Sequence, residues 1–378
     1  MKIFGWLSAI AVFLTASAAP SDLGIQAVPT GGLVPELAGA WTKGEPVRIA
    51  DQKGKKVTVL YFWAVNQQSL EDMPRMGELA REFADKPVTF VGVGCDSVNK
   101  VTEFFRAKEL PMPILVDDQL SNLCRFLRPT DRIPLAVIVD REGRLVWRGA
   151  TAALTPILRE VVDGKFDLKE HIRREAFAEK VRTALGKSHY EEALKLIDAE
   201  LEKHPGNVEL IALKANIWTR GLNKPEAAVE AVDAGLKAAP REGALYDLKV
   251  KLLHVTHDYA ALSKLYDDAI RVFADDPRRL LRFAEMEMQQ PLRDNRPELY
   301  CKLFKAARAS KGLKNDRERG LVELAHARML FFCGRPELAF AGAKRAAVLL
   351  KDTPRYDEAR TMAEFYRRAA NVAKQLRE

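Results

Sequence analysis

The segment Asn66-Gln67-Gln68-Ser69 follows directly after the apolar residues 60–64, at the point where a strand would lead into a helix. Thiol–disulfide exchange at such a turn needs a thiolate of lowered pKa with a second thiol beside it. Asn66 has no ionisable group, and the hydroxyl of Ser69 is a poor nucleophile unless a base assists it. No histidine lies near Ser69 in the sequence, so we expect residues 69–72 to form a capping box at a helix N-terminus.

The chain has four cysteines, none of them in a Cys-x-x-Cys pair: Cys95, Cys124, Cys301 and Cys333. Cys95 and Cys124 both come after predicted strands, at one edge of a sheet, where they could meet as a disulfide or act as a relocated redox pair. The alternative is that each is a free cysteine packed as a small apolar side chain. Cys301 and Cys333 fall on apolar helix faces, and we expect them to pack there.

His254 and His257 stand three residues apart, a spacing that can place two metal ligands on one helix face. The sequence gives no evident third ligand, so we predict no metal site. We also predict no cofactor.

The first residues have the features of a secretory signal. Lys2 supplies a positive charge, residues 3–14 form an apolar run, and Ala16-Ser17-Ala18 fits a cleavage site. We predict a signal peptide over residues 1–18 and export to the periplasm or the outside of the cell. The apolar run is shorter than the ~20 residues that a membrane-spanning helix needs, and no other long run follows, so we predict no transmembrane segment.

Composition limits the class of partner. The 378 residues are 47% hydrophobic, which allows more than one domain with a sizeable core, and the formal net charge is +8. The charges alternate in sign along predicted helices and do not form a basic face with interleaved aromatic residues. We therefore expect a solvated helical surface and no nucleic-acid partner.

Residues 47–162 are predicted to form one α/β domain, preceded by an extension over 19–46 that is rich in Pro, Gly and Ala. Strands alternate with helices, which predicts a largely parallel sheet covered on both faces and closed by an antiparallel hairpin. The predicted strands are 47–50, 57–62, 88–93, 112–116, 135–139 and 145–148, and the predicted helices are 69–83, 100–107 and 120–127.

Residues 166–378 are predicted to be all helical and to contain an internal repeat. Pro205, Pro240 and Pro277 stand 35 and 37 residues apart, and each is expected to end the second helix of a pair. A helix pair of this length cannot bury its apolar face alone, so neighbouring pairs must stack.

The α/β domain resembles the thioredoxin-like family, in its exported TlpA/ResA branch with links to the peroxiredoxin-type redoxins. The resemblance rests on segments that occur in the family order: Phe62-Trp63-Ala64, Met73-Pro74, Val91-Gly92-Val93, Ile133-Pro134 and 139–143. It implies a mixed central sheet with flanking helices. Counted back from Met73-Pro74, Ser69 falls on the second cysteine of the family's redox pair and Asn66 on the first, which implies a degenerate redox site.

Pro134 corresponds to the family proline that faces the redox pair and follows a cis peptide bond. The resemblance implies that Ile133 and Pro134, beside Trp63, line a shallow groove for an extended peptide. The alternative is a turn that defines the fold and binds no ligand.

The helical region resembles tetratricopeptide repeats, on three segments: Gly186…Tyr190…Ala193…Pro205, Gly221…Ala228…Pro240 and Gly334…Ala339…Pro354. The resemblance implies a curved superhelix whose concave face binds a peptide. The alternative is a spacer without a ligand.

These features favour a binding module over an enzyme. We expect an exported protein that captures a protein or peptide partner in the cell envelope, through the tetratricopeptide-like face or the groove at Pro134. The alternative is a thiol–disulfide oxidoreductase of the TlpA/redoxin type that uses Cys95 and Cys124.

Overall fold

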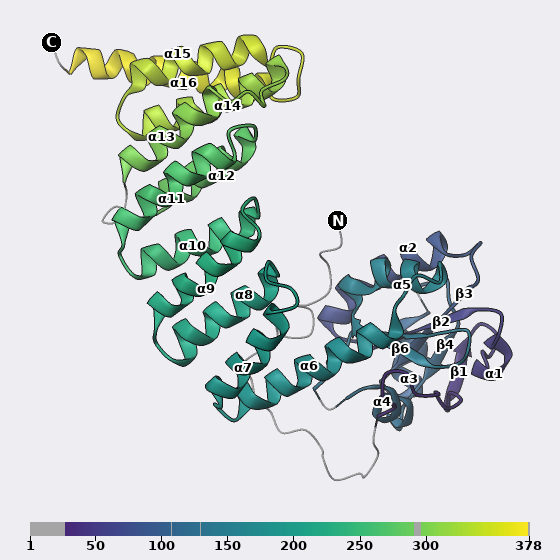
Figure 1. Cartoon of the computed structure of the whole chain (residues 1–378). Coiled ribbons are helices and arrows are strands. Elements are labelled where there is room, and N and C mark those ends of the chain that lie inside the picture. Colours follow the sequence, from purple (N-terminus) through teal and green to yellow (C-terminus); the bar gives the residue numbers. More distant parts are fainter. Residues whose placement is uncertain (1–26, 107, 129, 291–295, 377–378) are drawn as a thin grey trace. The chain divides into compact units, whose positions relative to one another are not determined.

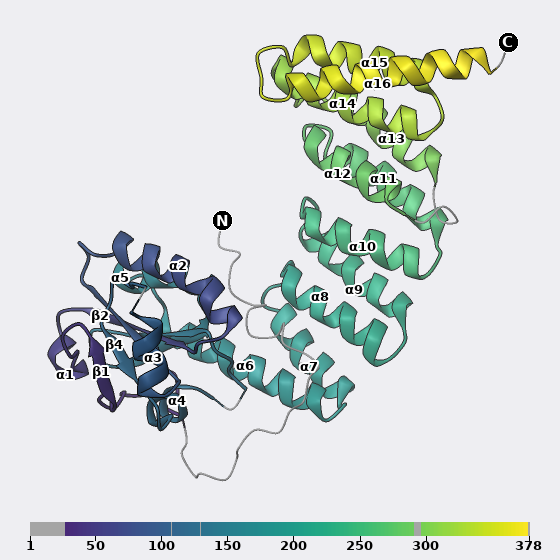
Figure 2. The ribbon, with the colours of Figure 1, turned by 180° about the vertical axis from the view of Figure 1, so that it is seen from behind.

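A computed structural model of the chain describes residues 27–106, 108–128, 130–290 and 296–376. The predicted signal peptide, residues 1–18, lies outside these ranges. The chain divides into two compact units, Met1–Thr183 and Ala184–Glu378, which we describe separately. Figure 1 and Figure 2 show their elements from opposite sides.

The first unit is built on a six-stranded mixed sheet in the order β1-β4-β3-β2-β5-β6. The strands are β1 (Ala40–Lys43), β2 (Val57–Trp63), β3 (Val88–Gly94), β4 (Ile114–Val116), β5 (Leu135–Val139) and β6 (Leu145–Ala150). β2 is parallel to β3 and antiparallel to β5, while β1 and β6 are antiparallel edges. The predicted thioredoxin-like sheet with flanking helices is confirmed.

Both faces of β2 are buried, which accounts for its nearly unbroken apolar sequence. One face packs under α2 (Gln67–Glu82), α3 (Val98–Phe104) and α5 (Leu154–Val162), and it carries Val57, Val59, Tyr61 and Trp63. The other face carries Leu60 and Phe62 and packs with α1 (Ile49–Gln52) and α4 (Ser121–Phe126). The strand is thereby fixed from both sides up to its last residue.

The described part of the extension before Val47 belongs to the folded first unit. β1 pairs with β4, and Leu33 forms a bridge with Arg144. Residues 47–50, predicted as a strand, instead lead into the short helix α1. The carboxylate of Glu36 accepts hydrogen bonds from the N–H groups of Ile49 and Ala50 at 2.8 and 2.7 Å, and a carboxylate at this position stabilises a helix N-terminus.

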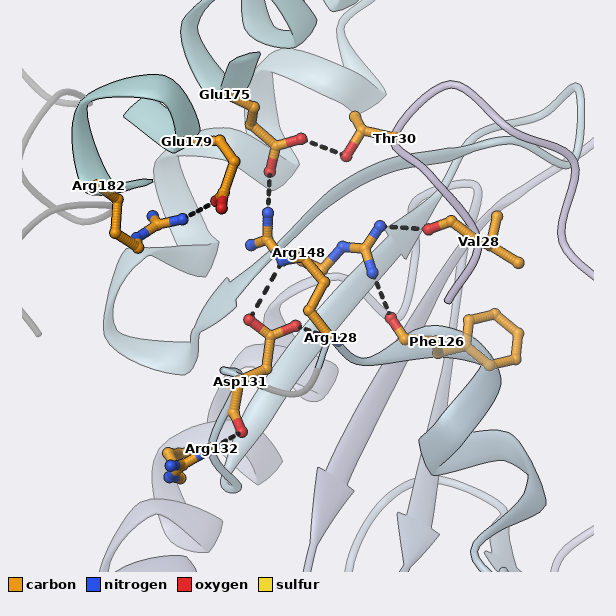
Figure 3. Close-up of polar contacts among 10 residues, drawn as sticks. All are labelled: Val28, Thr30, Phe126, Arg128, Asp131, Arg132, Arg148, Glu175, Glu179 and Arg182. Atoms are coloured by element: carbon orange, nitrogen blue, oxygen red, sulfur yellow. Dashed lines mark hydrogen bonds and ion pairs between the residues drawn. The ribbon is translucent and has the colours of Figure 1, made fainter. Parts of the chain in front are cut away.

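A polar cluster fastens the N-terminal segment and helix α6 (Leu168–Gly186) to the sheet, as Figure 3 shows. Arg148 of β6 is 5% exposed, and its guanidinium donates to the last carbonyl of α4, at 2.8 Å, and to the carbonyl of Val28. Glu175 of α6 pairs with Arg128 at 3.3 Å and accepts from the hydroxyl of Thr30 at 2.5 Å. α6 is thus held by charge as well as by packing.

In its described part, the second unit consists of helices. They are α7 (Tyr190–Leu201), α8 (Val208–Asn216), α9 (Pro225–Ala238), α10 (Gly243–Val255), α11 (Tyr259–Val272), α12 (Pro277–Met288), α13 (Pro297–Arg308), α14 (Asp316–Phe332), α15 (Pro336–Leu349) and α16 (Tyr356–Gln375). Helices that are neighbours in sequence pack on each other, as α8 does on α9 and α14 on α15. Over the ranges that the structure describes, no helix is both long enough and apolar enough to cross a membrane.

The repeated prolines lie at helix junctions, with one departure from the prediction. Pro205, Pro240 and Pro354 follow the ends of α7, α9 and α15. Pro277 comes after α11, but it is also the first residue of α12. A proline is tolerated there because the first N–H groups of a helix have no partner within the helix.

Candidate functional site at the end of strand β2

The candidate site lies at the edge of the sheet where β2 and β3 both end. Trp63 pairs with Gly94, and Phe62 pairs with Leu135 at the start of β5. The carboxyl ends of parallel strands share one edge of a sheet, which is where α/β proteins commonly place functional residues. This edge therefore carries the turn 64–66, Cys95, Asp96 and Pro134.

Asn66, and not Ser69, caps helix α2. The helix begins at Gln67, and the side chain of Asn66 accepts a hydrogen bond from the N–H of Ser69 at 2.9 Å. Ser69 is fully buried in the first turn, where its hydroxyl accepts from the N–H of Ala64 at 3.2 Å. The predicted capping box over 69–72 is wrong, because both residue types can cap a helix and the helix starts early enough for Asn66 to do so.

Asp72 of helix α2, expected as the acidic residue of a capping box, instead lies near the hydroxyl of Tyr61. The hydroxyl of the buried Tyr61 donates to the carbonyl oxygen of Ser69 at 3.4 Å. Burial raises the pKa of Tyr61, and the nearby carboxylate of Asp72 raises it further. Asp72 also forms a salt bridge with Arg75 at 2.5 Å. The available signal was the position of Asp72, three residues after Ser69 on the same helix face.

Cys95 follows β3 and is held beside Trp63, to whose carbonyl oxygen its N–H donates at 2.8 Å. Burial raises the pKa of the Cys95 thiol to about 12, and the carboxylates of Asp117 and Asp96 contribute to the shift. The thiol is therefore protonated at neutral pH. Since the thiolate is the nucleophilic form of cysteine, Cys95 is poorly suited to attack a disulfide.

Asp96 holds the backbone of the turn. Its carboxylate accepts from the N–H of Val65 at 2.6 Å and pairs with Lys100 at 2.6 Å. Burial alone would raise the pKa of Asp96, but the hydrogen bonds from Lys100 and Val65 outweigh burial and lower it. The carboxylate is thus ionised and committed to two partners.

The disulfide left open between Cys95 and Cys124 is not formed. Cys124 lies on α4, both thiols are partly buried, and all four cysteines of the chain are free.

Trp63 is fully buried, so it cannot line a peptide groove as expected. Its ring packs against those of Phe104 and Phe105, with centroids 5.7 and 5.5 Å away. The Ile133–Pro134 bond is cis, as the resemblance implied, and both residues are partly exposed. Of the three residues predicted to bind a peptide, only Ile133 and Pro134 are accessible.

His254 and His257 do not converge on one point. The imidazole of His254 contacts the carboxylate of Glu287 at 2.8 Å, whereas His257 lies near the hydroxyl of Tyr259 at 3.2 Å. Within the described residues, no group of three or more His, Cys, Asp or Glu side chains could hold a metal ion. His254 thus joins α10 to α12, whereas His257 is exposed in the turn after α10.

Comparison with known proteins places the first unit in a family. The profile of the AhpC/TSA family matches residues 30–148, a range that contains the β2–α2 turn. The thioredoxin-like protein YneN of Bacillus subtilis is 36% identical over 127 residues, which are 32% of this chain and 70% of YneN. The chain belongs to the thioredoxin-like AhpC/TSA family. Its match begins before β1, in agreement with the folded segment ahead of Val47.

Other similar proteins are named as thiol–disulfide oxidoreductases. ResA of Bacillus cereus is 26% identical over 106 residues, 28% of this chain and 60% of ResA. The thioredoxin domain of a thiol-disulfide oxidoreductase from Bacteroides vulgatus has 22% identity and a TM-score of 0.31, and the match covers 36% of this chain and 99% of that domain. The first unit is thus similar in sequence to a protein named as a thiol–disulfide oxidoreductase, although its own β2–α2 turn carries no cysteine.

Proposed function

We propose that the protein is an exported thioredoxin-like module that binds a protein or peptide partner and does not exchange thiols at the β2–α2 turn. The observation that carries the proposal is the use of Asn66 and Ser69, whose side chains both accept hydrogen bonds that hold the start of α2. The thiol that follows β3 at the same edge of the sheet, Cys95, has a pKa raised to about 12. A redox step at this edge therefore lacks the thiolate that would begin it.

In this proposal, the partner lies over the exposed side of the turn. The side chains at positions 66–68 are exposed, and Ile133 and Pro134, which directly precede β5, are partly exposed. Amides beside an apolar rim suit an extended peptide, because its backbone needs hydrogen-bond partners and its side chains need apolar contact. The helical unit, which we propose to be tetratricopeptide-like, offers a second surface for the same class of partner.

The proposal also places the mature chain outside the cytoplasm. Lys2, the apolar run 3–14 and Ala16-Ser17-Ala18 have the pattern of a cleaved leader. Mass measurement of the chain recovered from cells that express it in full is expected to give a mature N-terminus at Ala19. An intact N-terminus at Met1 would contradict the leader.

Peptide capture tests the binding proposal. A library of fluorescent peptides is screened by polarisation against the mature chain, and the tightest binder is then measured with variants. A variant with Ser at all four cysteines should bind equally well. Ile133→Asp should weaken binding by about tenfold or more, because the new carboxylate would lose its hydration when an apolar peptide side chain packs against it. The control is Leu338→Asp, at an exposed leucine of α15.

Two outcomes count against the proposal. One is that no peptide binds above background. The other is that the variant with Ser at all four cysteines no longer binds the peptide. A loss of binding with Leu338→Asp and not with Ile133→Asp would assign the partner to the helical unit and remove it from the groove.

A second candidate function is thiol–disulfide exchange through Cys95 and Cys124, which the similarity to ResA favours. Insulin reduction by dithiothreitol separates the two functions. Turnover that is lost in Cys95→Ala/Cys124→Ala but kept in Cys301→Ala/Cys333→Ala would overturn the binding proposal. If the protein is a binding module, both variants and the wild type leave the uncatalysed rate unchanged.

A further inference from the structure

Three sulfur atoms meet in the helical unit. The sulfur of Met329, on α14, lies 3.7 Å from the sulfur of Cys301 on α13 and 3.6 Å from that of Cys333, which follows the last residue of α14. The sulfur of Met329 is therefore in contact with both thiols.

The packing of two helices explains the cluster. Met329 and Cys333 stand four residues apart and so share one helix face, against which α13 brings Cys301. Met329 is 2% exposed, and its thioether is fixed in the core, whereas Cys301 is exposed. The cluster thus has a rigid ligand at its base and an open side toward solvent.

We propose that Cys301, Met329 and Cys333 bind one soft monovalent metal ion of the Cu(I) class. Thiolate and thioether sulfur select such ions, while Mg²⁺ and Ca²⁺ require oxygen ligands. A metal–sulfur bond is about 2.3 Å long, so three sulfurs around an ion in one plane stand about 4.0 Å apart. The sulfurs observed at 3.6 and 3.7 Å need to separate by only a few tenths of an ångström.

The charge balance of this site is simple. Two thiols release two protons and one Cu⁺ enters, which leaves a complex of net charge −1, and no electron is transferred. The guanidinium of Arg335 is close enough to Cys301 for its positive charge to act on the sulfur. Arg335 therefore offsets the negative charge of the complex.

The hydroxyl of Tyr300 completes the surroundings. It lies 3.3 Å from the sulfur of Cys333 and is itself buried, so it can donate a hydrogen bond to the thiolate once the metal has displaced the proton. Hydrogen bonds of this kind orient metal ligands and strengthen binding.

A competition experiment with Cu(I) tests the site. Cu(I) is added without oxygen to the reduced full-length chain in the presence of bathocuproine disulfonate, whose Cu(I) complex is coloured. The wild type is expected to withdraw one Cu(I) per chain, and Cys301→Ser/Cys333→Ser is expected to withdraw none. Met329→Leu conserves the side-chain volume but removes the thioether ligand. It should lower the Cu(I) affinity by about tenfold or more, because mutation of residues that only support the ligands of a metal already lowers metal affinity by that factor. Cys95→Ser/Cys124→Ser is the matched control and should behave as the wild type.

Several results would overturn the proposal. They are Cu(I) withdrawal that is no stronger in the wild type than in Cys301→Ser/Cys333→Ser, unchanged affinity in Met329→Leu, and a Cys301–Cys333 disulfide that dithiothreitol does not open. If the double serine variant fails to fold, a thermal-shift experiment with Ag⁺ takes the place of that comparison. Ag⁺ is a soft ion that keeps its oxidation state. Ag⁺ should raise the melting temperature of the wild type more than that of Met329→Leu, and an equal rise counts against the site.

Discussion

At the scale of single residues, the β2–α2 turn shows side chains that hold a backbone in place. The first N–H groups of a helix have no partner within the helix and must find one elsewhere. Asn66 supplies a partner for the N–H of Ser69, while Asp96 and Ser69 serve the N–H groups of Val65 and Ala64. These three polar side chains therefore accept hydrogen bonds from the backbone of the turn, which is a structural role.

The cap can be tested by substitution. Asn66→Ala should lower the free energy of unfolding of the first unit by about 1 kcal/mol, because the N–H of Ser69 loses its acceptor. Asn66→Asp keeps an acceptor at the same place and should have little effect. Urea titrations of both variants provide the measurement, and a loss in Asn66→Asp as large as in Asn66→Ala would contradict capping by Asn66.

Restoring sulfur tests whether Asn66 and Ser69 occupy the family's redox positions. Asn66→Cys/Ser69→Cys should form a disulfide and gain insulin reductase activity, because a thiol at a helix N-terminus has a lowered pKa. The matched control, Asn66→Cys/Gln68→Cys, has the wrong spacing and should gain none. If the first variant neither forms a disulfide nor reduces insulin, the positional assignment is wrong.

At the scale of elements, the sequence predicted the strands that are formed by continuous apolar runs. β2, β3 and β5 are continuous apolar runs and were predicted to within a residue or so. β1 and α1 were missed: Ala40–Lys43 is no apolar run, and α1 is fixed by Glu36, which lies 13 residues before Ile49. The meeting of Cys301 with Cys333 likewise comes from the packing of two helices and has no signature along the chain.

Helix α6 carries a histidine whose protonation opposes folding. The ring of His171 packs against Phe166, with centroids 5.2 Å apart. Burial lowers the pKa of His171. The carboxylate of Glu175 acts in the opposite direction, the charges of Arg174 and Arg128 add to the lowering, and the net shift is downward. The folded unit therefore binds fewer protons than the unfolded chain, whose histidines titrate near about 6.5, so stability falls as pH drops through that value.

Replacement of His171 should flatten this dependence. In His171→Gln, the free energy of unfolding of the first unit should change less between about pH 7 and pH 5 than in the wild type. Urea titrations at several pH values, followed by tryptophan fluorescence, give the comparison. His326→Gln is the control, because burial also lowers the pKa of His326 but that residue lies in the second unit. Curves for His171→Gln that run parallel to the wild type would contradict the argument.

At the scale of the whole molecule, the two units are built from different kinds of contact. The first unit depends on strand pairs far apart in sequence, such as β2 with β5, whereas the second stacks helices that are neighbours in sequence. Each unit has its own buried cores. We therefore predict that each unit unfolds with its own free energy, and that a cavity in one leaves the stability of the other unchanged.

A pair of matched cavities tests this independence. Phe62 and Phe283 are both fully buried, one in the sheet of the first unit and one in the helical core of the second. Each Phe→Ala substitution should cost its own unit about 3–5 kcal/mol, through lost burial and the cavity that remains. In a Trp218→Phe background the tryptophans of the mature chain lie in the first unit, so fluorescence reports that unit while far-ultraviolet circular dichroism is dominated by the helices of the second. Phe62→Ala should lower the midpoint of the fluorescence transition alone, and Phe283→Ala that of the main dichroism transition. One common shift in both signals would mean that the units unfold as a single body.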